Sequence, residues 1–168
     1  MKLLIVYGTK AGATAHCAEK IRQQLPDGLR ENADLTDIRQ LNRRKMAEYD
    51  AFVIGTPIYM GRIHGKIRRF FQRYRKRLLD KPLHLFICSL APGAEGVTLF
   101  RQKADPDLFE HATQVSQLGC EIHPDRMNAF YRFIIQKIME TEKPEVGLRD
   151  NDIAAFARGI ASAGSSSS

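Results

Sequence analysis

Three short runs of mostly apolar residues, at 2–7, 51–54 and 83–90, each end at turn-forming residues such as Gly8 and Gly55. Runs without polar alternation are typical of strands that are buried on both faces, as in a parallel sheet. Segments of helical length separate the runs, and parallel strands need crossover connections of this kind. The pattern therefore predicts right-handed βαβ units and an α/β fold.

The remaining segments complete this prediction. Apolar spacing and start and stop residues predict helices at 13–25, 61–79, 105–118, 127–141 and 151–163, with a shorter one at 42–47. The polar stretch 29–34 is predicted as an edge strand and 120–122 as a short last strand. These elements predict a parallel sheet of about five strands. We expect one domain over 1–163, followed by a disordered Ser-rich tail at 164–168.

The composition excludes several classes of protein. A chain of 168 residues can bury a core without disulfides or metals. It has no run of about 20 apolar residues that could cross a bilayer, and no signal-peptide pattern at its start. Its three cysteines, at positions 17, 88 and 120, lack metal-ligand spacing. We therefore expect a reduced, cytoplasmic protein.

The charge is unbalanced, with 26 Lys and Arg against 19 Asp and Glu, a net charge of +7. Such a field favours an anionic partner: nucleic acid, an acidic membrane surface, or a ligand that carries phosphate or carboxylate. Solubility alone is the alternative explanation for part of it.

Three loops follow the carboxyl ends of the buried strands, where open parallel sheets bind ligands. In the first, 8–14, small residues, the hydroxyls of Thr9 and Thr14, and Lys10 precede a helix N-terminus, which attracts anions. The segment has neither a Walker sequence nor GxGxxG. It is interpreted as a phosphate-binding loop, with a hydroxyl-capped strand-to-helix turn as the alternative.

The other two loops could flank a flat ring. In 56–62, Pro57 fixes the chain while Tyr59 and Met60 offer aromatic and apolar surface; ordinary packing is the alternative for Tyr59. In 89–96, small residues expose backbone donors and acceptors.

Residues 5–14 resemble the FMN-phosphate loop of the flavodoxins, and 53–61 resemble the loop over their isoalloxazine ring. Within that superfamily, the chain is most similar to the menaquinone-dependent protoporphyrinogen dehydrogenases of bacterial haem synthesis. Lys10, the stretch 59–65 that leads into a basic helix, and 129–139 carry this similarity.

The resemblance implies FMN as cofactor and a flavodoxin-like three-layer sandwich with strand order 2-1-3-4-5. It implies that the cofactor-binding residues are Thr9, Lys10, Ala11, Gly12, Ala13 and Thr14 at the phosphate; Thr56, Pro57, Ile58, Tyr59, Met60 and Gly61 at the flavin; and Ser89, Leu90, Ala91 and Gly93 on its other side. Ala11 stands where flavodoxins commonly place a hydroxyl. The stretch 92–111 is shorter and less basic than the insertion of the porphyrinogen enzymes.

No other catalytic set competes with this one, and we assign no catalytic residue and no metal. The five histidines are scattered and there is no GxSxG sequence. Cys17 lies near a helix N-terminus, which favours a thiolate, but a buried structural thiol is the simpler interpretation.

The predicted helix after Gly61 is strongly basic. Its apolar residues form one stripe, which leaves most of the cations on the outer side. A solvated face is one interpretation, and docking to an anionic membrane is the other, through Arg62, Lys66, Arg68, Arg69, Arg73, Arg75, Lys76 and Arg77. Nucleic acid is not expected, because no recognisable nucleic-acid module is present. The apolar helix at 127–141 is interpreted as core, as a membrane-interface element, or as a wall of the flavin pocket.

These observations give three functional hypotheses. The first is an FMN-dependent oxidoreductase that passes electrons from a small-molecule substrate, expected to be a porphyrinogen, to a quinone acceptor; it would be cytoplasmic, with peripheral attachment to the inner face of the membrane. The second is a flavodoxin-type electron carrier without its own organic substrate. The third is a non-catalytic basic module that binds membrane or nucleic acid.

Overall fold

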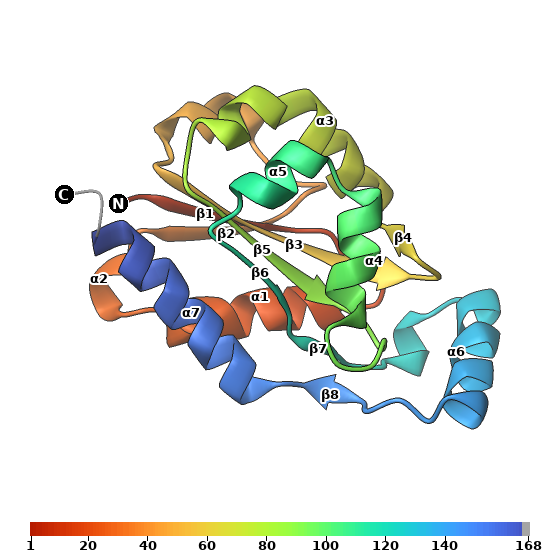
Figure 1. Ribbon diagram of the computed structural model, residues 1–168. Helices are drawn as coiled ribbons and strands as arrows, with labels where there is room; N and C mark the ends of the chain where they lie inside the picture. The colour runs from red at the N-terminus through yellow and green to blue at the C-terminus, as the bar shows by residue number, and fades with distance from the viewer. Residues whose placement is uncertain (166–168) are drawn as a thin grey trace.

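The computed structural model describes residues 1–165 and contains the predicted parallel sheet (Figure 1). Its strands are β1 (Leu3–Tyr7), β2 (Ala33–Asp37), β3 (Ala51–Tyr59), β5 (Leu83–Cys88) and β6 (Gln114–Gln117). They are all parallel and lie in the order β2-β1-β3-β5-β6. Counted as five successive strands, this is the predicted order 2-1-3-4-5, which is confirmed.

Helices cover both faces of the sheet, which confirms the three-layer arrangement (Figure 1). One face carries α1 (Ala13–Gln24) and α7 (Asp150–Ser165), and the other carries α3 (Gly65–Leu79), α4 (Glu95–Lys103) and α5 (Pro106–His111). Successive side chains of a strand point to opposite faces. Leu3 and Ile5 therefore pack toward α1 and α7, while Leu4 and Val6 pack toward α3.

The N-terminal edge strand starts later than predicted. Residues 29–30 belong to the short helix α2 (Asp27–Arg30), and β2 occupies 33–37, where Ala33 is opposite Leu3. Pro26 precedes the first turn of α2, a position at which proline is tolerated, so the Pro26–Gly28 sequence begins a helical turn here. A short helix follows as the 3-10 helix η1 (Arg43–Glu48).

The other edge was also predicted wrongly. The helix expected over 105–118 ends at His111, and the last sheet strand is 114–117 instead of 120–122. This strand was not predicted because its polar side chains do not form an apolar run. Gln114 donates to the Phe156 carbonyl, and Gln117 donates to the Ala91 carbonyl. Residues beyond it form β7 (Gly119–Cys120), which pairs with β8 (Gly147–Leu148) in a separate small sheet.

Between these two short strands lie the 3-10 helix η2 (Pro124–Arg126) and α6 (Ala129–Thr141). The expected shortened insertion at 92–111 is instead the α4–α5 crossover from β5 to β6, so the additional segment beside the sheet is 121–146. Helix α7 continues two residues beyond its predicted end at 163, and the rest of the predicted tail, 166–168, lies outside the described residues.

The three cysteines are free and buried, as the core interpretation of Cys17 requires. Burial raises the pKa of Cys120 to about 12, so this thiol stays protonated at neutral pH. Within residues 1–165, no helix combines the length and apolarity needed to cross a membrane.

Candidate cofactor site

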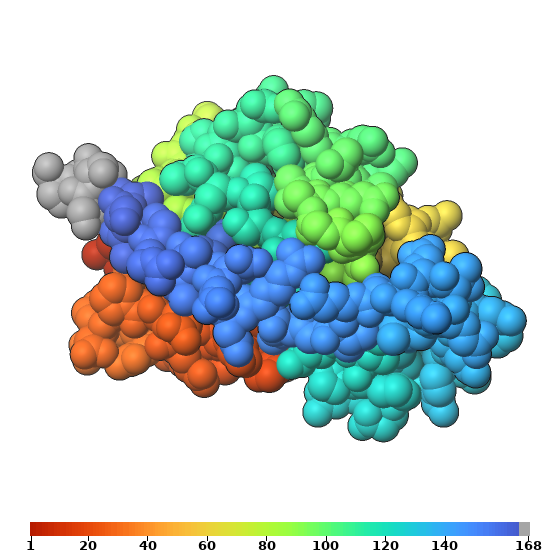
Figure 2. All heavy atoms as spheres, turned by 60° about the horizontal axis from the view of Figure 1, so that its bottom comes forward, coloured from red at the N-terminus to blue at the C-terminus, as the bar shows by residue number. Residues whose placement is uncertain are grey.

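The three predicted loops meet at the carboxyl edge of the sheet. They follow β1, β3 and β5, which are neighbours, so their ends lie side by side. The segment that carries η2 and α6 lies beside them, and Figure 2 shows this cyan-to-blue stretch running as a continuous band across one face toward α7. Two cavities open between the loops and α6, of about 250 Å³ and 440 Å³.

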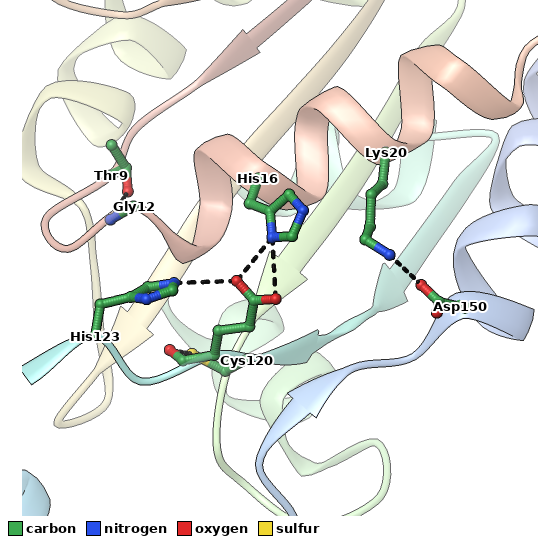
Figure 3. Close-up of polar contacts among 8 residues, drawn as sticks. Thr9, Gly12, His16, Lys20, Cys120, His123 and Asp150 are labelled. Atoms are coloured by element: carbon green, nitrogen blue, oxygen red, sulfur yellow. Dashed lines mark hydrogen bonds and ion pairs between the residues drawn. The ribbon is translucent and has the colours of Figure 1, made fainter.

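The loop after β1 has the geometry of an anion site. Gly12 caps α1 in the left-handed conformation (φ 98°), and its N–H donates to the Thr9 hydroxyl at 2.9 Å (Figure 3). The N–H groups of the first helical turn have no intrahelical acceptor and form the positive end of the helix dipole. No acidic residue occupies that turn. Thr14 is 1% exposed, and its hydroxyl has no strong hydrogen-bond partner in the described chain, since its one interaction is with the buried Cys88 thiol. These donors fit a phosphate group.

Two cations line the 440 Å³ cavity from the sheet side. Lys10 Nζ donates to the Tyr131 hydroxyl at 2.6 Å, so α6 is bonded directly to the phosphate loop. Arg39 makes a two-pronged ion pair with Asp37, at 2.6 and 2.9 Å. Burial alone would raise the pKa of Asp37, but hydrogen bonds from Arg39 hold it below its ordinary value.

The segment after β3 is a hairpin. The sequence predicted a loop over 56–62 and a helix from Gly61, and that helix, α3, begins only at Gly65. Strand β3 continues through Pro57 to Tyr59, and Met60 (φ 51°) and Gly61 (φ 69°) turn the chain into the antiparallel strand β4 (Arg62–Ile63). Positive φ at both turn residues is the type I′ geometry of tight hairpins. Met60 is 66% exposed at the tip. The ring of Tyr59 lies 6.1 Å from that of Tyr131, centroid to centroid, and burial raises its pKa.

The loop after β5 is held by side chains. Ser89 Oγ accepts from the Ala91 N–H at 3.1 Å, and Gln117 donates to the Ala91 carbonyl at 2.7 Å. The Gly93 carbonyl accepts from Arg149, on the side of the loop that faces α7.

The structure brings most of the predicted residues together. The smaller cavity is lined by Ile58, Tyr59, Met60, Gly61, Ser89, Leu90 and Ala91, and the larger one by Thr9, Lys10 and Ala11. Gly12, Ala13 and Thr14 form the start of α1. Like those three residues, Thr56, Pro57 and Gly93 line neither cavity. Thr56 and Pro57 are buried in β3, where the Thr56 hydroxyl accepts from the His64 N–H, and Gly93 lies on the side of its loop that faces α7.

Sequence reasoning missed part of the site. Tyr131 and Ile135 of α6 line both cavities, so the flavin-pocket interpretation of this helix agrees with its position. Arg39 and Arg126 also line the larger cavity. Nothing in the sequence separates these two arginines from the other basic residues.

A carboxylate between two histidines anchors the start of the extra segment to α1. The Glu121 carboxylate lies 2.9 Å from His16 Nδ1 and 3.1 Å from His123 Nε2 (Figure 3). Burial would raise the pKa of Glu121, but hydrogen bonds with both histidines lower it. Lys20 pairs with Asp150 at 2.8 Å further along the same helix. Across residues 1–165, no group of three His, Cys, Asp or Glu side chains could hold a metal ion.

A third, larger hollow of about 830 Å³ is lined by the hairpin, the start of α3 and the start of α6. The aromatic residues that line it are Tyr59, Phe130 and Tyr131. The cations that line it come from separate elements and are Lys10, Arg62, Arg68 and Lys103. Of the eight predicted basic residues, Arg62 lies in β4 and the other seven lie on α3. All eight are exposed except Arg75, which is half-buried and pairs with Asp105 and Asp107 of α5 and its cap.

Comparison with known proteins gives concordant results. A family model described as a flavodoxin domain matches residues 4–146. A protoporphyrinogen IX dehydrogenase [quinone] of Leishmania major is 26% identical over 89 residues, which are 53% of this chain and 38% of that protein. The chain therefore spans well under half of that relative.

Solved structures share the fold. Flavodoxin 2 of Bacillus cereus matches with a TM-score of 0.56 at 18% identity, over 96% of this chain and 99% of its own. A flavoprotein of Lactobacillus acidophilus, solved in complex with FMN, matches with a TM-score of 0.52 at 17% identity, over 69% of this chain and 92% of its own.

Proposed function

This chain belongs to the flavodoxin-domain family, and from that premise we propose that it is an FMN-dependent oxidoreductase that oxidises a porphyrinogen and reduces a quinone. FMN is the cofactor that the family assignment supports. When bound, FMN supplies the electron-transfer chemistry, and the protein supplies binding, orientation and electrostatics.

The chain's own residues would divide that work between the loops. The first turn of α1 and the hydroxyls of Thr9 and Thr14 would hold the phosphate. Tyr59 and the loop after β5 line the cavity next to it, where a flat ring would be enclosed by apolar groups. Tyr131 would exclude water from the phosphate side, because its hydroxyl is bonded to Lys10.

The observation that carries the substrate proposal is the basic hollow beside this site. Arg62, Arg68 and Lys103 face a space of about 830 Å³ with aromatic walls, which suits a flat organic molecule that carries carboxylates. Porphyrinogens have this character. The similarity to a protein named protoporphyrinogen IX dehydrogenase points the same way.

A flavodoxin-type electron carrier is the second candidate. The observation in its favour is the near-complete overlap with Bacillus cereus flavodoxin 2, which covers 96% of this chain and 99% of that one.

One experiment separates the two. The FMN-loaded protein is mixed with protoporphyrinogen and a menaquinone analogue, and porphyrin fluorescence is followed. We expect oxidation that requires both FMN and the quinone, and a fall in rate for Arg68→Gln. The matched control is Arg158→Gln, an exposed cation on α7. Oxidation at the uncatalysed rate would favour the carrier, and a purified protein that binds no FMN would contradict both.

We also propose that the basic stripe of α3 and the exposed aromatic residues of α6 attach the protein to an anionic membrane. Phe130 and Phe133 are 65% and 59% exposed, and Phe130 borders the same hollow as Arg68. A quinone acceptor resides in the bilayer, so attachment to the membrane would bring the 830 Å³ hollow close to the quinone.

A further inference from the structure

The cavity beside the phosphate loop contains a cation that the protein itself leaves unpaired. Lys10, Arg39 and Arg126 all line it. Lys10 is bonded to Tyr131, and Arg39 is paired with Asp37. The guanidinium of Arg126 has no hydrogen bond or ion pair with any residue of the described chain.

The position of Arg126 is specific. A Cβ atom built on Gly12 would lie 2.6 Å from Arg126 Nη1, so the guanidinium lies against the residue that caps α1. Gly12 is at positive φ, which favours glycine at this cap. Arg126 reaches the cap from η2, more than 110 positions along the chain.

Several contacts fix the segment that carries Arg126. Its N–H donates to the His123 carbonyl, and Glu121 is held by His16 of α1 and by His123 (Figure 3). On the other side, Arg132 of α6 donates to the Met127 carbonyl at 3.1 Å. The backbone at Arg126 is therefore tied both to α1 and to α6.

The donors beside this guanidinium come from the backbone. The N–H groups at the start of α1 have no intrahelical acceptor, and no acidic residue lies in that first turn. An unpaired cation above these N–H groups is satisfied by an anion with several acceptor oxygens.

We propose that Arg126 is a ligand of the cofactor's phosphomonoester, so that the segment between the last strands contributes to cofactor binding. This inference rests on the proposed binding of FMN. A guanidinium presents a planar fork that matches two phosphate oxygens. Arg126 would thus supply the charge that the uncharged N–H and hydroxyl donors of the loop do not, and would discriminate FMN from riboflavin, which lacks the phosphate.

The test is the dissociation constant of FMN, measured by quenching of flavin fluorescence. We expect Arg126→Gln to weaken FMN binding about tenfold or more, and Arg126→Lys to weaken it less. Riboflavin binding should change less than twofold. Arg158→Gln removes the same charge from an exposed position on α7 and should leave both ligands unaffected. Thermal unfolding of the ligand-free variants should match the wild type, because the Arg126 side chain has no protein partner to lose.

A second readout uses FMN alone. The slope of log Kd against log salt should be shallower for Arg126→Gln than for the wild type or Arg158→Gln, because an ion pair is screened by salt. An unchanged FMN affinity and slope, or an equal loss for FMN and riboflavin, would overturn the inference while leaving the proposed function intact. A wild-type protein that binds no FMN would overturn the proposed function and this inference with it.

Discussion

At the residue scale, the Thr14 hydroxyl links folding to cofactor binding. It is buried, and its one interaction in the described chain is with the Cys88 thiol, a weak hydrogen-bonding group. A buried hydroxyl without a strong partner costs ~1–3 kcal/mol. We expect Thr14→Val, which keeps the shape of the side chain, to raise the free energy of unfolding of the ligand-free protein by ~1 kcal/mol. The same variant should weaken FMN binding about tenfold, since one phosphate hydrogen bond is lost.

Urea unfolding and FMN titration measure these two opposite effects. Thr36→Val is the control, because Thr36 lies in β2 outside both cavities. Loss of stability in the ligand-free Thr14→Val protein would mean that the hydroxyl has a structural role, and the phosphate assignment would lose its main support.

His84 makes a separate prediction about pH. It is fully buried in β5, its Nδ1 accepts from Gln114, and burial lowers its pKa to about 4. In the unfolded chain this histidine has its ordinary pKa of ~6.5, so below that pH it binds a proton that it does not bind in the folded protein. The free energy of unfolding should therefore be highest above pH 6.5 and fall by ~3 kcal/mol as the pH decreases from 6.5 to 4.

Replacing His84 by Asn should remove most of this slope, measured by urea unfolding at several pH values between 7 and 4. The matched control is His111→Asn, an exposed histidine whose ring bonds the Lys81 carbonyl. Equal slopes in wild type and His84→Asn would show that His84 is not the group responsible. Glu121 acts in a lower pH range, because its pKa in the folded protein lies below the ordinary carboxyl value. Its contribution to stability is complete above the ordinary carboxyl pKa and is lost as the pH falls through the lowered pKa.

At the scale of elements, the close packing of β3 against β5 requires a residue without a side chain at Gly55. A Cβ on Gly55 would lie 2.0 Å from Phe86 Cζ, in the centre of the sheet. We expect Gly55→Ala to lower the free energy of unfolding by ~2–3 kcal/mol, because overpacking a core forces its neighbours to shift. Phe86→Leu in the same chain should recover part of the loss. Gly28→Ala, with no atom within 4 Å of the new Cβ, should cost nothing, and a similar cost at both glycines would contradict the packing argument.

The elements that the sequence predicted well are those whose pattern follows from burial. Strands β1, β3 and β5 are buried on both faces and therefore read as apolar runs. The prediction of the edge strand β6 failed because its polar side chains make hydrogen bonds inside the protein. Gln114 and Gln117 donate to backbone carbonyls of α7 and of the loop after β5. Composition alone does not reveal such cross-chain contacts.

The candidate site divides in the same way. Loops that follow directly from a buried strand were predicted from the strand itself, and the structure brings most of their residues to two adjoining cavities. Arg39, Arg126 and Tyr131 come from segments whose position depends on tertiary contacts, such as the carboxylate of Glu121 between two histidines. Their role could be recognised only once the chain was folded.

At the scale of the whole molecule, part of the net charge of +7 is concentrated on the exposed face of α3. Arg68, Arg69 and Arg73 are exposed there. Met60 and Phe130 supply exposed apolar side chains at the hollow that Arg68 lines, and Phe133 of α6 is also exposed. Each basic residue close to an anionic bilayer contributes about 1 kcal/mol. A triple Arg→Gln variant at these three positions should therefore bind vesicles about 100-fold more weakly.

Sedimentation with vesicles of phosphatidylglycerol and of phosphatidylcholine tests this expectation. Binding should be confined to the anionic vesicles and should weaken as salt rises, because ion pairs with headgroups are screened. Replacing Arg30, Lys143 and Arg158 by Gln removes the same number of charges from other surfaces and should have little effect, whereas Phe130→Ser with Phe133→Ser should weaken the binding that persists at high salt. If both triple variants lose affinity equally, the attraction reflects net charge alone, and α3 is a solvated helix face with no particular orientation toward the membrane.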